Sequence, residues 1–437
     1  MKTILFVSSA KFWLENRGNH ARTANLYRAL CARGYHCCIC YLGSLDEADE
    51  ELLRTCFGNP RIYTLATEIP TNELKPDRGQ RETQSRSISK AIPGWHSLGK
   101  WTLTQVKRGT RVSRHIARYI RSPESGLLGS YAEKNIYDFY SKAHLEYFRA
   151  LCKFLKPDYI LVAYANLAYL VKGLDKVLAY HPVTLVDTMD VLHERCQWFH
   201  SVGERHWISI TRKEEKECLD LFDVVIAEQK RDAATFQKML PGKRILSVGH
   251  VSEIISHKFQ TKPYVNITYV SSKGPHNTWA IQKFIKSTWP LLSDRFGHQI
   301  CVHIVGSVCS ALHAPSMPDG VILEGVVKDL INIYRDADIV INPVYFGGGL
   351  KIKTVEALCH CKPVVTTSVG AYGLEHGIDE AFYVCDDEGS FFERLSRLVI
   401  HPNLRQELSE KAYRFARKNF TEQEAFRELF DFLIKVN

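Results

Sequence analysis

A strand–glycine–helix sequence near the C-terminus constrains the fold more than any other stretch of this chain. Residues 338–341 are an apolar run typical of a buried strand, three glycines follow at 347–349, and a helical pattern begins directly after them. Glycine lets the backbone approach an oxyanion closely and adopt a positive φ without steric cost. The first turn of a helix presents free N–H groups and the positive end of the helix dipole. The sequence therefore predicts a turn built to bind an anion.

Charged side chains on the predicted helix favour a phosphate-bearing ligand. Lys351 and Lys353 lie at its start, where a helix normally prefers acids, and a bound diphosphate would offset that unfavourable placement. Glu356 follows about one and a half turns later and can accept hydrogen bonds from sugar hydroxyls. We interpret the stretch as a nucleotide-sugar site, while a plain tight turn remains the alternative on spacing alone.

Alternating strand and helix patterns run through most of the chain and predict the α/β fold class with parallel sheets. The 437 residues are enough for two domains. We expect a Rossmann-like domain at residues 1–250, a second at 251–420, and a final helix at 421–437 that packs back on the first domain. Ligands of such domains bind at the carboxyl ends of the strands, and two domains facing each other would enclose a cleft.

The expected elements have the following bounds. Strands are predicted at residues 4–8, 36–42, 61–65, 157–164, 182–187, 222–227, 245–250, 265–271, 300–306, 321–323, 338–341, 363–367 and 382–384. Helices are predicted at residues 21–33, 145–155, 210–221, 232–239, 277–291, 327–335, 350–360, 390–400, 404–418 and 421–436.

Residues 68–130 interrupt this order and concentrate positive charge. Between positions 75 and 121 the chain has twelve Lys and Arg against two acids, a net charge of +10, whereas the whole chain carries +9. A helix is predicted at 101–121, with arginines on one face and apolar residues on the other. It is either an ordinary surface helix or, through residues 100–121, a contact with an anionic membrane face or a phosphate-bearing acceptor. Aromatic residues are sparse among these charges, which argues against nucleic acid as a partner.

Cysteine usage and hydropathy bear on location. Thirteen cysteines, an odd number scattered through strand and helix patterns, suit a reducing cytoplasm. No window reaches about 18 uninterrupted apolar residues, so we expect no transmembrane helix. Residues 1–9 are typical of a first core strand and not of a signal peptide.

Three short motifs imitate metal sites, and we interpret them as structural. The cysteines at 37–40 alternate faces on a predicted strand, whereas metal ligands usually lie on turns. The Cys-His-Cys of residues 359–361 falls at a helix end, and the Asp-Ala-Asp of residues 336–338 precedes a strand instead of ending one. We therefore expect no metal site.

Several C-terminal stretches resemble, in the same order, the retaining glycosyltransferases of the two-Rossmann-domain (GT-B) type, family four or group 1. These stretches are residues 334–343, 347–351, 356–358, 362–367 and 370–374, and residues 156–159 and 187–190 match more weakly. The resemblance implies two Rossmann-like domains facing across a cleft. It implies transfer of a hexosyl-type sugar from a nucleotide-sugar to an acceptor, with retention of the anomeric configuration and with no metal or cofactor.

The resemblance also implies roles in the glycine-rich turn. Many family members pair two glutamates separated by seven residues. Glu356 matches the second, which holds the ribose hydroxyls, whereas the first falls at Gly348 and is absent. A sub-branch has a glycine-rich loop there, with backbone N–H groups in its place. The implied catalytic residues are Lys351, Glu356 and Asp190, and the implied donor-binding residues are Gly347, Gly348, Gly349, Leu350, Lys353 and Lys273.

Other candidates lie in loops after the first strand of each half. Gly18, Asn19 and His20 are expected in the loop after residues 4–8, on the acceptor side of the cleft. Lys273, after residues 265–271, is either a second diphosphate-binding group or a plain turn lysine.

The segment 187–190 is a further candidate part of the cleft. Relatives often carry a histidine here, where this chain has Met189. Either aspartate of the segment can support the reaction, and Asp187 can instead cap the next turn. His193 and Arg195 follow closely enough to reach the cleft.

Three hypotheses follow. The leading one is a cytoplasmic transferase, peripheral on the inner membrane face, that moves a sugar to a glycan, lipid-linked or phosphorylated acceptor in cell-surface polysaccharide biosynthesis. A sugar-nucleotide 2-epimerase shares the architecture but needs paired carboxylates, which the glycine at 348 does not favour. A non-catalytic relative that binds a glycan or a partner is supported by Gly348, Met189 and Cys361, where a glycine is usual. Lys351 and Glu356 argue against that third hypothesis.

Overall fold

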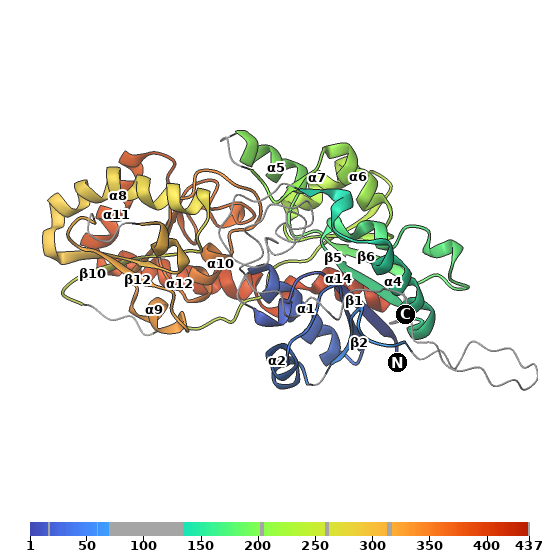
Figure 1. Ribbon diagram of the computed structural model, residues 1–437. Helices are drawn as coiled ribbons and strands as arrows, with labels where there is room; N and C mark the ends of the chain where they lie inside the picture. Colours follow the sequence, from blue (N-terminus) through green and yellow to red (C-terminus); the bar gives the residue numbers. More distant parts are fainter. Residues whose placement is uncertain are drawn as a thin grey trace, which may run out of the picture. The chain divides into compact units, whose positions relative to one another are not determined.

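The computed structural model describes residues 1–15, 18–58, 60–69, 134–201, 205–257, 262–312 and 317–435 (Figure 1). The basic insert predicted at 68–130 lies outside the described residues, except for positions 68 and 69. The described residues resume at 134. The chain divides into two compact units, Met1–Asp187 with Arg205–Val224 and Thr188–Glu204 with Val225–Asn437. This division differs from the boundary that we expect at 250–251, which stays a prediction.

A seven-stranded sheet has the order β3-β2-β1-β5-β6-β8-β9. Its strands are β1 (Thr3–Ser8), β2 (His36–Tyr41), β3 (Arg61–Tyr63), β5 (Tyr159–Ala163), β6 (Val183–Asp187), β8 (Val224–Ala227) and β9 (Arg244–Ser247). β1 pairs in parallel with β2 on one side and β5 on the other. The chain starts in the middle of the sheet and then reverses direction across it, which is the doubly wound arrangement predicted from the alternating pattern.

The described part of the first unit contains the α-helices α1 (Gly18–Ala32), α2 (Glu47–Phe57), α4 (Lys142–Leu155) and α6 (Arg212–Asp220). Three of them begin with capping boxes, at Asp46, Ser141 and Thr211, where a side chain satisfies a free backbone N–H of the first turn. A small sheet pairs β4 (Lys134–Asn135) with β7 (Ile208–Ser209). Sequence analysis missed α2 and this small sheet.

The loop predicted for Gly18, Asn19 and His20 is wrong, because these residues form the first turn of α1. Backbone N–H groups of a first helical turn have no partner inside the helix, so glycine and polar residues are tolerated there. The preceding segment is itself compact, since Phe12–Leu14 forms a 3-10 turn that buries Phe12 and Trp13.

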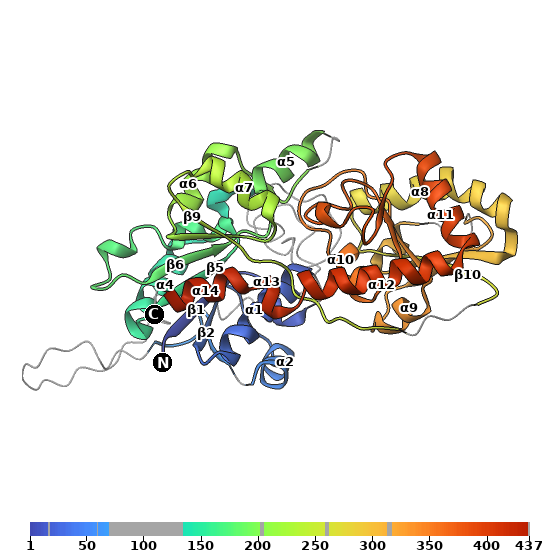
Figure 2. The same ribbon diagram turned by 180° about the vertical axis from the view of Figure 1, so that it is seen from behind.

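A six-stranded parallel sheet in the second unit has the order β12-β11-β10-β13-β14-β15 (Figure 2). Its strands are β10 (Val265–Val270), β11 (Ile300–Val305), β12 (Val321–Gly325), β13 (Ile339–Asn342), β14 (Val364–Thr366) and β15 (Tyr383–Val384). This is the Rossmann order, and the direction of winding reverses between β10 and β13. Ligands of such sheets bind outside the carboxyl ends of the strands at that reversal.

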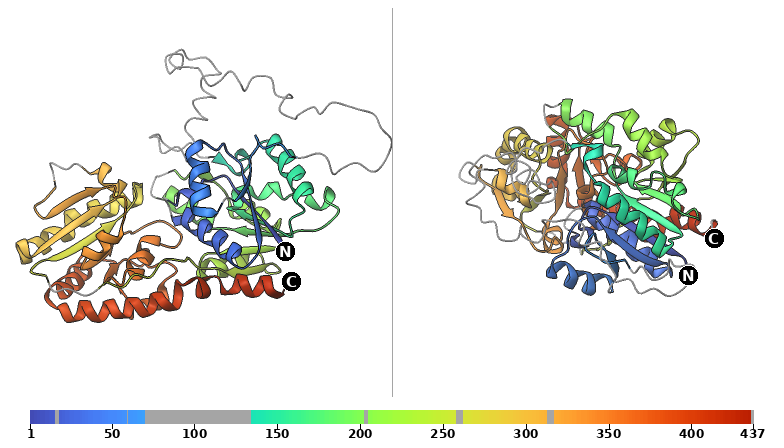
Figure 3. Two further views of the ribbon diagram at one scale, coloured as in Figure 1. Left: turned by 90° about the horizontal axis from the view of Figure 1, so that it is seen from below. Right: turned by 45° about the vertical axis from the view of Figure 1, so that its right-hand side comes forward.

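Helices cover both faces of the six-stranded sheet (Figure 3). The second unit contains α5 (Leu192–Ser201), α7 (Lys230–Met239), α8 (Pro275–Phe296), α9 (Ile331–Asp336), α10 (Ile352–Cys359), α11 (Glu388–Ile400), α12 (Pro402–Asn419), α13 (Glu422–Ala425) and α14 (Arg427–Lys435). The 3-10 segments among the described residues, besides Phe12–Leu14, are Ile136–Asp138, Ala165–Leu170, Leu174–Lys176, Gly297–Gln299, Ser307–Ala311 and Glu375–Gly377.

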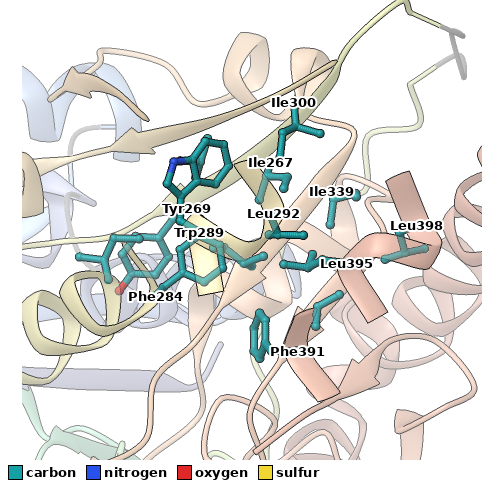
Figure 4. Close-up of a cluster of buried hydrophobic side chains, with 14 of the residues drawn as sticks. Ile267, Tyr269, Phe284, Trp289, Leu292, Ile300, Ile339, Phe391, Leu395 and Leu398 are labelled. Atoms are coloured by element: carbon teal, nitrogen blue, oxygen red, sulfur yellow. The ribbon is translucent and has the colours of Figure 1, made fainter. Parts of the chain in front are cut away.

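Alternate residues of the strands enter two separate cores. Ile339 and Ile341 of β13 pack with α8 and α11, in the core shown in Figure 4, whereas Val340 packs with α9, α10 and α12. Successive side chains of a strand point to opposite faces, so a strand covered on both faces is apolar throughout. The continuous apolar run at 338–341 has this origin. Trp289 of α8 is fully buried in the first core, and its indole N–H donates to the carbonyl of Asp319.

Two sequence-based helix predictions need correction. The helix expected at 350–360 begins at Ile352, so Lys351 is its N-cap and not part of its first turn. The single helix expected at 421–436 is broken into α13 and α14 at Phe426, whose ring is buried at the break and packs edge-on against Phe430. Among the described residues, no helix is both long and apolar enough to cross a bilayer.

Candidate functional site

The predicted glycine turn lies at the carboxyl end of β13, beside the winding reversal of the sheet. Gly347 and Gly349 have φ values of 112° and 72°, in the region that favours glycine. The ammonium of Lys351 donates to the carbonyls of Gly347, Gly348 and Gly349 at 3.4, 2.5 and 2.9 Å. The side chain of Lys351 is therefore buried beneath the turn, and its hydrogen bonds stabilise the conformation of the turn.

Asp190 lies against this turn. A β-carbon built at Gly349 would lie 1.9 Å from Oδ1 of Asp190, so no other residue fits at position 349 without movement. The carboxylate of Asp190 also forms an ion pair with Arg195 of α5. Asp190 follows Met189, a bulky residue with φ of 62°, and such backbone strain is concentrated at functional sites. The structure thus brings together two candidates, Asp190 and the glycine turn, that lie far apart in the sequence.

Burial shifts the titration of the charged groups beside the turn. Burial raises the pKa of Asp190, and Arg195 opposes that rise. Burial lowers the pKa of Lys351 to about 8, while the charge of Asp190 favours the protonated amine. Asp232, at the start of α7, has its pKa raised to about 7 by burial and by the neighbouring carboxylates of Asp190 and Glu228. Groups that titrate near neutrality in such a cluster are typical of functional sites.

Lys353 belongs to the first turn of α10, and its side chain reaches the carboxyl end of β10. Its ammonium donates to the hydroxyls of Tyr269 and Ser271 at 3.3 and 3.1 Å and to the amide oxygen of Asn277 at 2.6 Å. These three acceptors are neutral, and burial together with the charge of Lys351 lowers the pKa of Lys353 well below its usual value. An anion bound here would supply the negative charge that the protein acceptors lack.

Glu356 projects from the second turn of α10 and is half-buried. Its Oε2 accepts a hydrogen bond from the hydroxyl of Tyr334 at 3.3 Å. Burial raises the pKa of Glu356, and the neighbouring His250, the hydrogen bond from Tyr334 and the charge of Lys353 oppose that rise. His250 is itself buried and lies 3.4 Å from the carboxylate of Glu228.

Sequence analysis missed His276, which faces the turn from the first turn of α8. Its ring packs edge-on against Phe199 and Phe346, and it is the nearest side chain to a β-carbon built at Gly347. Burial and the charges of Lys353, Lys351 and Arg195 lower its pKa to about 2, so the imidazole is neutral at physiological pH. The signal in the sequence was its place at a helix start, directly after Lys273-Gly274-Pro275.

The remaining candidates lie in different surroundings. Lys273 is exposed, and its backbone N–H donates to Ser307. Leu350 is half-buried and packs against the second core. Gly18, Asn19 and His20 belong to the first unit, in α1.

The two aspartates of the segment 187–190 have different partners. Arg22 of α1 binds Asp187 through a buried double hydrogen bond, with Nη2 to Oδ1 at 2.9 Å and Nε to Oδ2 at 3.0 Å. A buried carboxylate needs such a charged partner. Arg195 reaches Asp190, whereas His193 is buried within α5.

The Asp-Ala-Asp of residues 336–338 lies directly before β13. Asp338 accepts a hydrogen bond at 2.9 Å from the backbone N–H of Asn266, which ties the start of β13 to the start of β10. Across the part of the chain that the structure describes, no three or more His, Cys, Asp or Glu side chains are grouped to hold a metal ion.

Comparison with known proteins adds a family match. Residues 265–401 match the family model of glycosyl transferases group 1. An uncharacterized 44.6 kDa protein in the cps region of Klebsiella pneumoniae is 27% identical over 103 residues, which make up 24% of this chain and 26% of that protein. The match thus spans about a quarter of this curated relative.

Solved structures match the whole chain. They include sucrose-phosphate synthase from Thermosynechococcus elongatus, with 12% identity, a TM-score of 0.65 and 100% of both chains covered. A TarM mutant from S. aureus in complex with Fondaparinux, alpha-GlcNAc-glycerol and UDP has 11% identity, a TM-score of 0.64 and 99% of both chains covered. HepE from Anabaena in complex with UDP-glucose has 14% identity, a TM-score of 0.60 and 100% of both chains covered.

These likenesses confirm the predicted fold, two Rossmann-like domains of the GT-B type. The matched group 1 domain spans β10 to α11 and contains the glycine turn, the three candidate lysines and Glu356. Fold and family match together support a GT-B glycosyltransferase.

Proposed function

We propose that this protein is a retaining, metal-independent glycosyltransferase that moves a sugar from a nucleotide-sugar to a glycan, lipid-linked or phosphorylated acceptor. The observation that carries the proposal is the convergence of the glycine turn, Lys351, Lys353 and Glu356 at the winding reversal of a Rossmann-like sheet. That place combines the open end of the strands with cations suited to phosphate.

Each group has a distinct part in the proposed reaction. The diphosphate of the donor lies over the glycine turn, where Lys351 and Lys353 supply the positive charge. As the bond between sugar and phosphate breaks, the leaving diphosphate gains negative charge, so cations fixed beforehand stabilise the transition state. Asp190 acts as a supporting group, because its charge keeps Lys351 protonated despite burial. Glu356 accepts hydrogen bonds from the ribose hydroxyls.

The related proteins support the nucleotide-sugar part of the proposal. HepE is described in complex with UDP-glucose, and the TarM mutant with UDP. The Klebsiella relative is described as lying in a cps region, which supports a role in cell-surface polysaccharide biosynthesis. We further propose that the enzyme acts at the cytoplasmic face of the membrane, through the basic residues 100–121.

One observation supports a second candidate function. Asp190, Glu228 and Asp232 interact electrostatically near the turn, and a sugar-nucleotide 2-epimerase needs carboxylates close to its substrate. An epimerase would convert its nucleotide-sugar into the epimer without an acceptor and would leave the sugar attached to the nucleotide.

Proton NMR of the reaction with UDP-, GDP-, ADP-, TDP- and CMP-sugars, in EDTA and without acceptor, tests the proposal. We expect slow release of the sugar from one donor, first seen as the anomer present in the donor. Release of the opposite anomer would contradict retention, and loss of the reaction in EDTA would contradict metal independence. A new nucleotide-sugar instead of free sugar would favour the epimerase.

A further inference from the structure

Tyr334 is a buried tyrosine whose hydroxyl group is hydrogen-bonded to Glu356. It lies in α9, its side chain is 1% exposed, and its hydroxyl donates to Oε2 of Glu356 at 3.3 Å. A buried hydroxyl without a partner would be costly, so this bond fixes both groups. The bond from Tyr334 therefore fixes the orientation of the carboxylate, whose remaining lone pairs, those of Oε1 above all, can accept from a ligand.

The ring of Tyr334 stacks on His360, which is hydrogen-bonded to a second histidine, His257. Its ring and that of His360 are 4.4 Å apart between centroids and inclined by 20°. His360 in turn lies parallel to His257, at 5.4 Å and 6°, and the two imidazoles share a hydrogen bond of 3.0 Å between Nδ1 of His360 and Nε2 of His257. Tyr334 stacked on His360, and His360 hydrogen-bonded edge to edge to His257, form one connected ring column that ends at Glu356.

Backbone hydrogen bonds attach this column to the end of α10. The N–H of Ile255 donates to the carbonyl of Cys359 at 2.9 Å, and the N–H of His360 donates to the carbonyl of Glu356 at 2.9 Å. The column is thus tied to the same helix that carries Glu356. A tyrosine hydroxyl held in this way has little freedom to move away from the carboxylate.

We propose that Tyr334 is a positioning residue that aims the carboxylate of Glu356 at the ribose of the bound nucleotide, with His360 and His257 fixing the tyrosine ring. The inference rests on the proposed function, since it requires a nucleotide at Glu356. It adds residues that take no part in the reaction themselves and act through Glu356. A carboxylate with one oxygen already engaged presents the second in a single direction, which lowers the ordering cost of binding.

Isothermal titration of the full-length protein with UDP, GDP, ADP, TDP and CMP tests the inference, using the nucleotide that binds best and its 2′,3′-dideoxy form. Tyr334→Phe should weaken the affinity for the complete nucleotide about fivefold, the effect of one net hydrogen bond. It should change the affinity for the dideoxy form less than about twofold, because that form has no ribose hydroxyls for Glu356. A purely structural role would weaken both affinities equally.

Further variants serve as controls for this interpretation. Tyr180→Phe removes a tyrosine hydrogen bond of 3.0 Å to the carbonyl of Cys152 in the first unit, and it should leave both affinities unchanged. His360→Phe keeps a stacking ring and should retain most of the affinity, whereas His360→Ala should resemble Tyr334→Phe. In a Glu356→Ala background, Tyr334→Phe should have no further effect.

The outcomes separate the two levels of the account. If the wild type binds none of the five nucleotides, the proposed function is wrong and the inference falls with it. If the wild type binds one and Tyr334→Phe binds its complete and dideoxy forms as the wild type does, the proposed function stands and the positioning role of Tyr334 is overturned. Equal weakening for both forms also overturns it.

Discussion

Oδ1 of Asp190 lies only 1.9 Å from the position that a β-carbon of residue 349 would take, so the carboxylate can keep its place only if residue 349 is glycine. The relationship joins two segments that the sequence separates by more than a hundred positions. It keeps the charge of Asp190 beside Lys351, whose pKa burial has lowered. The turn and the carboxylate therefore act as one part of the site.

Substitution of Gly349 should lower turnover strongly, whereas substitution of Gly348 should be tolerated. Gly349→Ala places a β-carbon on Asp190 and on a backbone with φ of 72°. The strain amounts to about 1–3 kcal/mol, and displacement of the turn should lower donor turnover on the order of 100-fold. At Gly348 a β-carbon would meet Arg195 at an ordinary 3.5 Å, so Gly348→Ala is the matched control. Equal activity of both variants in a donor-hydrolysis assay would contradict the account.

Affinity for the nucleotide should depend on the protonation of Lys351. Burial lowers its pKa to about 8, from 10.5 in an exposed lysine. Below pH 8 the amine is charged and attracts the diphosphate; as the pH rises through about 8 the unliganded protein loses this proton, and affinity should fall. Titration calorimetry with the preferred nucleoside diphosphate between pH 6 and about 9.5 measures the effect. Lys351→Met should bind weakly at every pH and show no midpoint near 8.

Asp190→Asn provides the control for this midpoint. The charge of Asp190 favours protonated Lys351, so its removal should shift the loss of affinity to lower pH. A midpoint that is unchanged in Asp190→Asn would show that the two groups are not coupled.

Substitution of Lys353 should separate stability from activity. The ammonium is half-buried among three neutral acceptors, so Lys353→Met relieves the burial of a charge while it removes three hydrogen bonds. We expect the free energy of unfolding to change by less than about 1 kcal/mol, since these effects oppose each other. Turnover should fall about 100-fold, because a phosphate-facing cation is lost. Denaturant unfolding and donor hydrolysis measure the two effects. A destabilised variant with normal turnover would assign Lys353 to the core alone.

The basic residues outside the described structure should bind anionic membranes. Replacement of Arg108, Arg111, Arg114 and Arg118 by Gln removes four charges from residues 100–121. Each is worth about 1 kcal/mol near an anionic surface, so the wild type should sediment with phosphatidylserine vesicles at low salt and the variant should not. Neutral vesicles are the control. If the wild type fails to bind at low salt, the contribution of these residues to localisation is wrong.

The Rossmann-like order of the second unit could be predicted from the sequence because its strands are covered on both faces. Val340 and its neighbours in β13 enter two different cores, so the whole strand is apolar and stands out from the flanking segments. Sequence analysis missed helix α2, because its first turn is acidic and its apolar face is weak. Leu53 is the one hydrophobic residue that this helix buries.

The turn and Glu356 could be predicted because they lie in one continuous stretch. The place of Asp190 against Gly349 could be suspected only from the resemblance, since nothing local relates the two positions. Tyr334 and His276 could not be singled out, because their roles arise from contacts between elements. The pairing of Asp187 with Arg22 could not be predicted either, because the two residues lie 165 positions apart in the sequence.

The central claim is that the turn and Glu356 form a nucleotide-sugar site, and release of nucleotide from donor sugars tests it most directly. The assay compares the wild type, Glu356→Ala and Glu393→Ala, an exposed glutamate on α11 of the same unit, in EDTA with the five classes of donor. We predict release from one donor by the wild type and by Glu393→Ala, and a loss of at least about tenfold in Glu356→Ala. Release by Glu356→Ala at the wild-type rate would contradict the site, and so would the absence of release from every donor combined with no thermal stabilisation by any nucleotide.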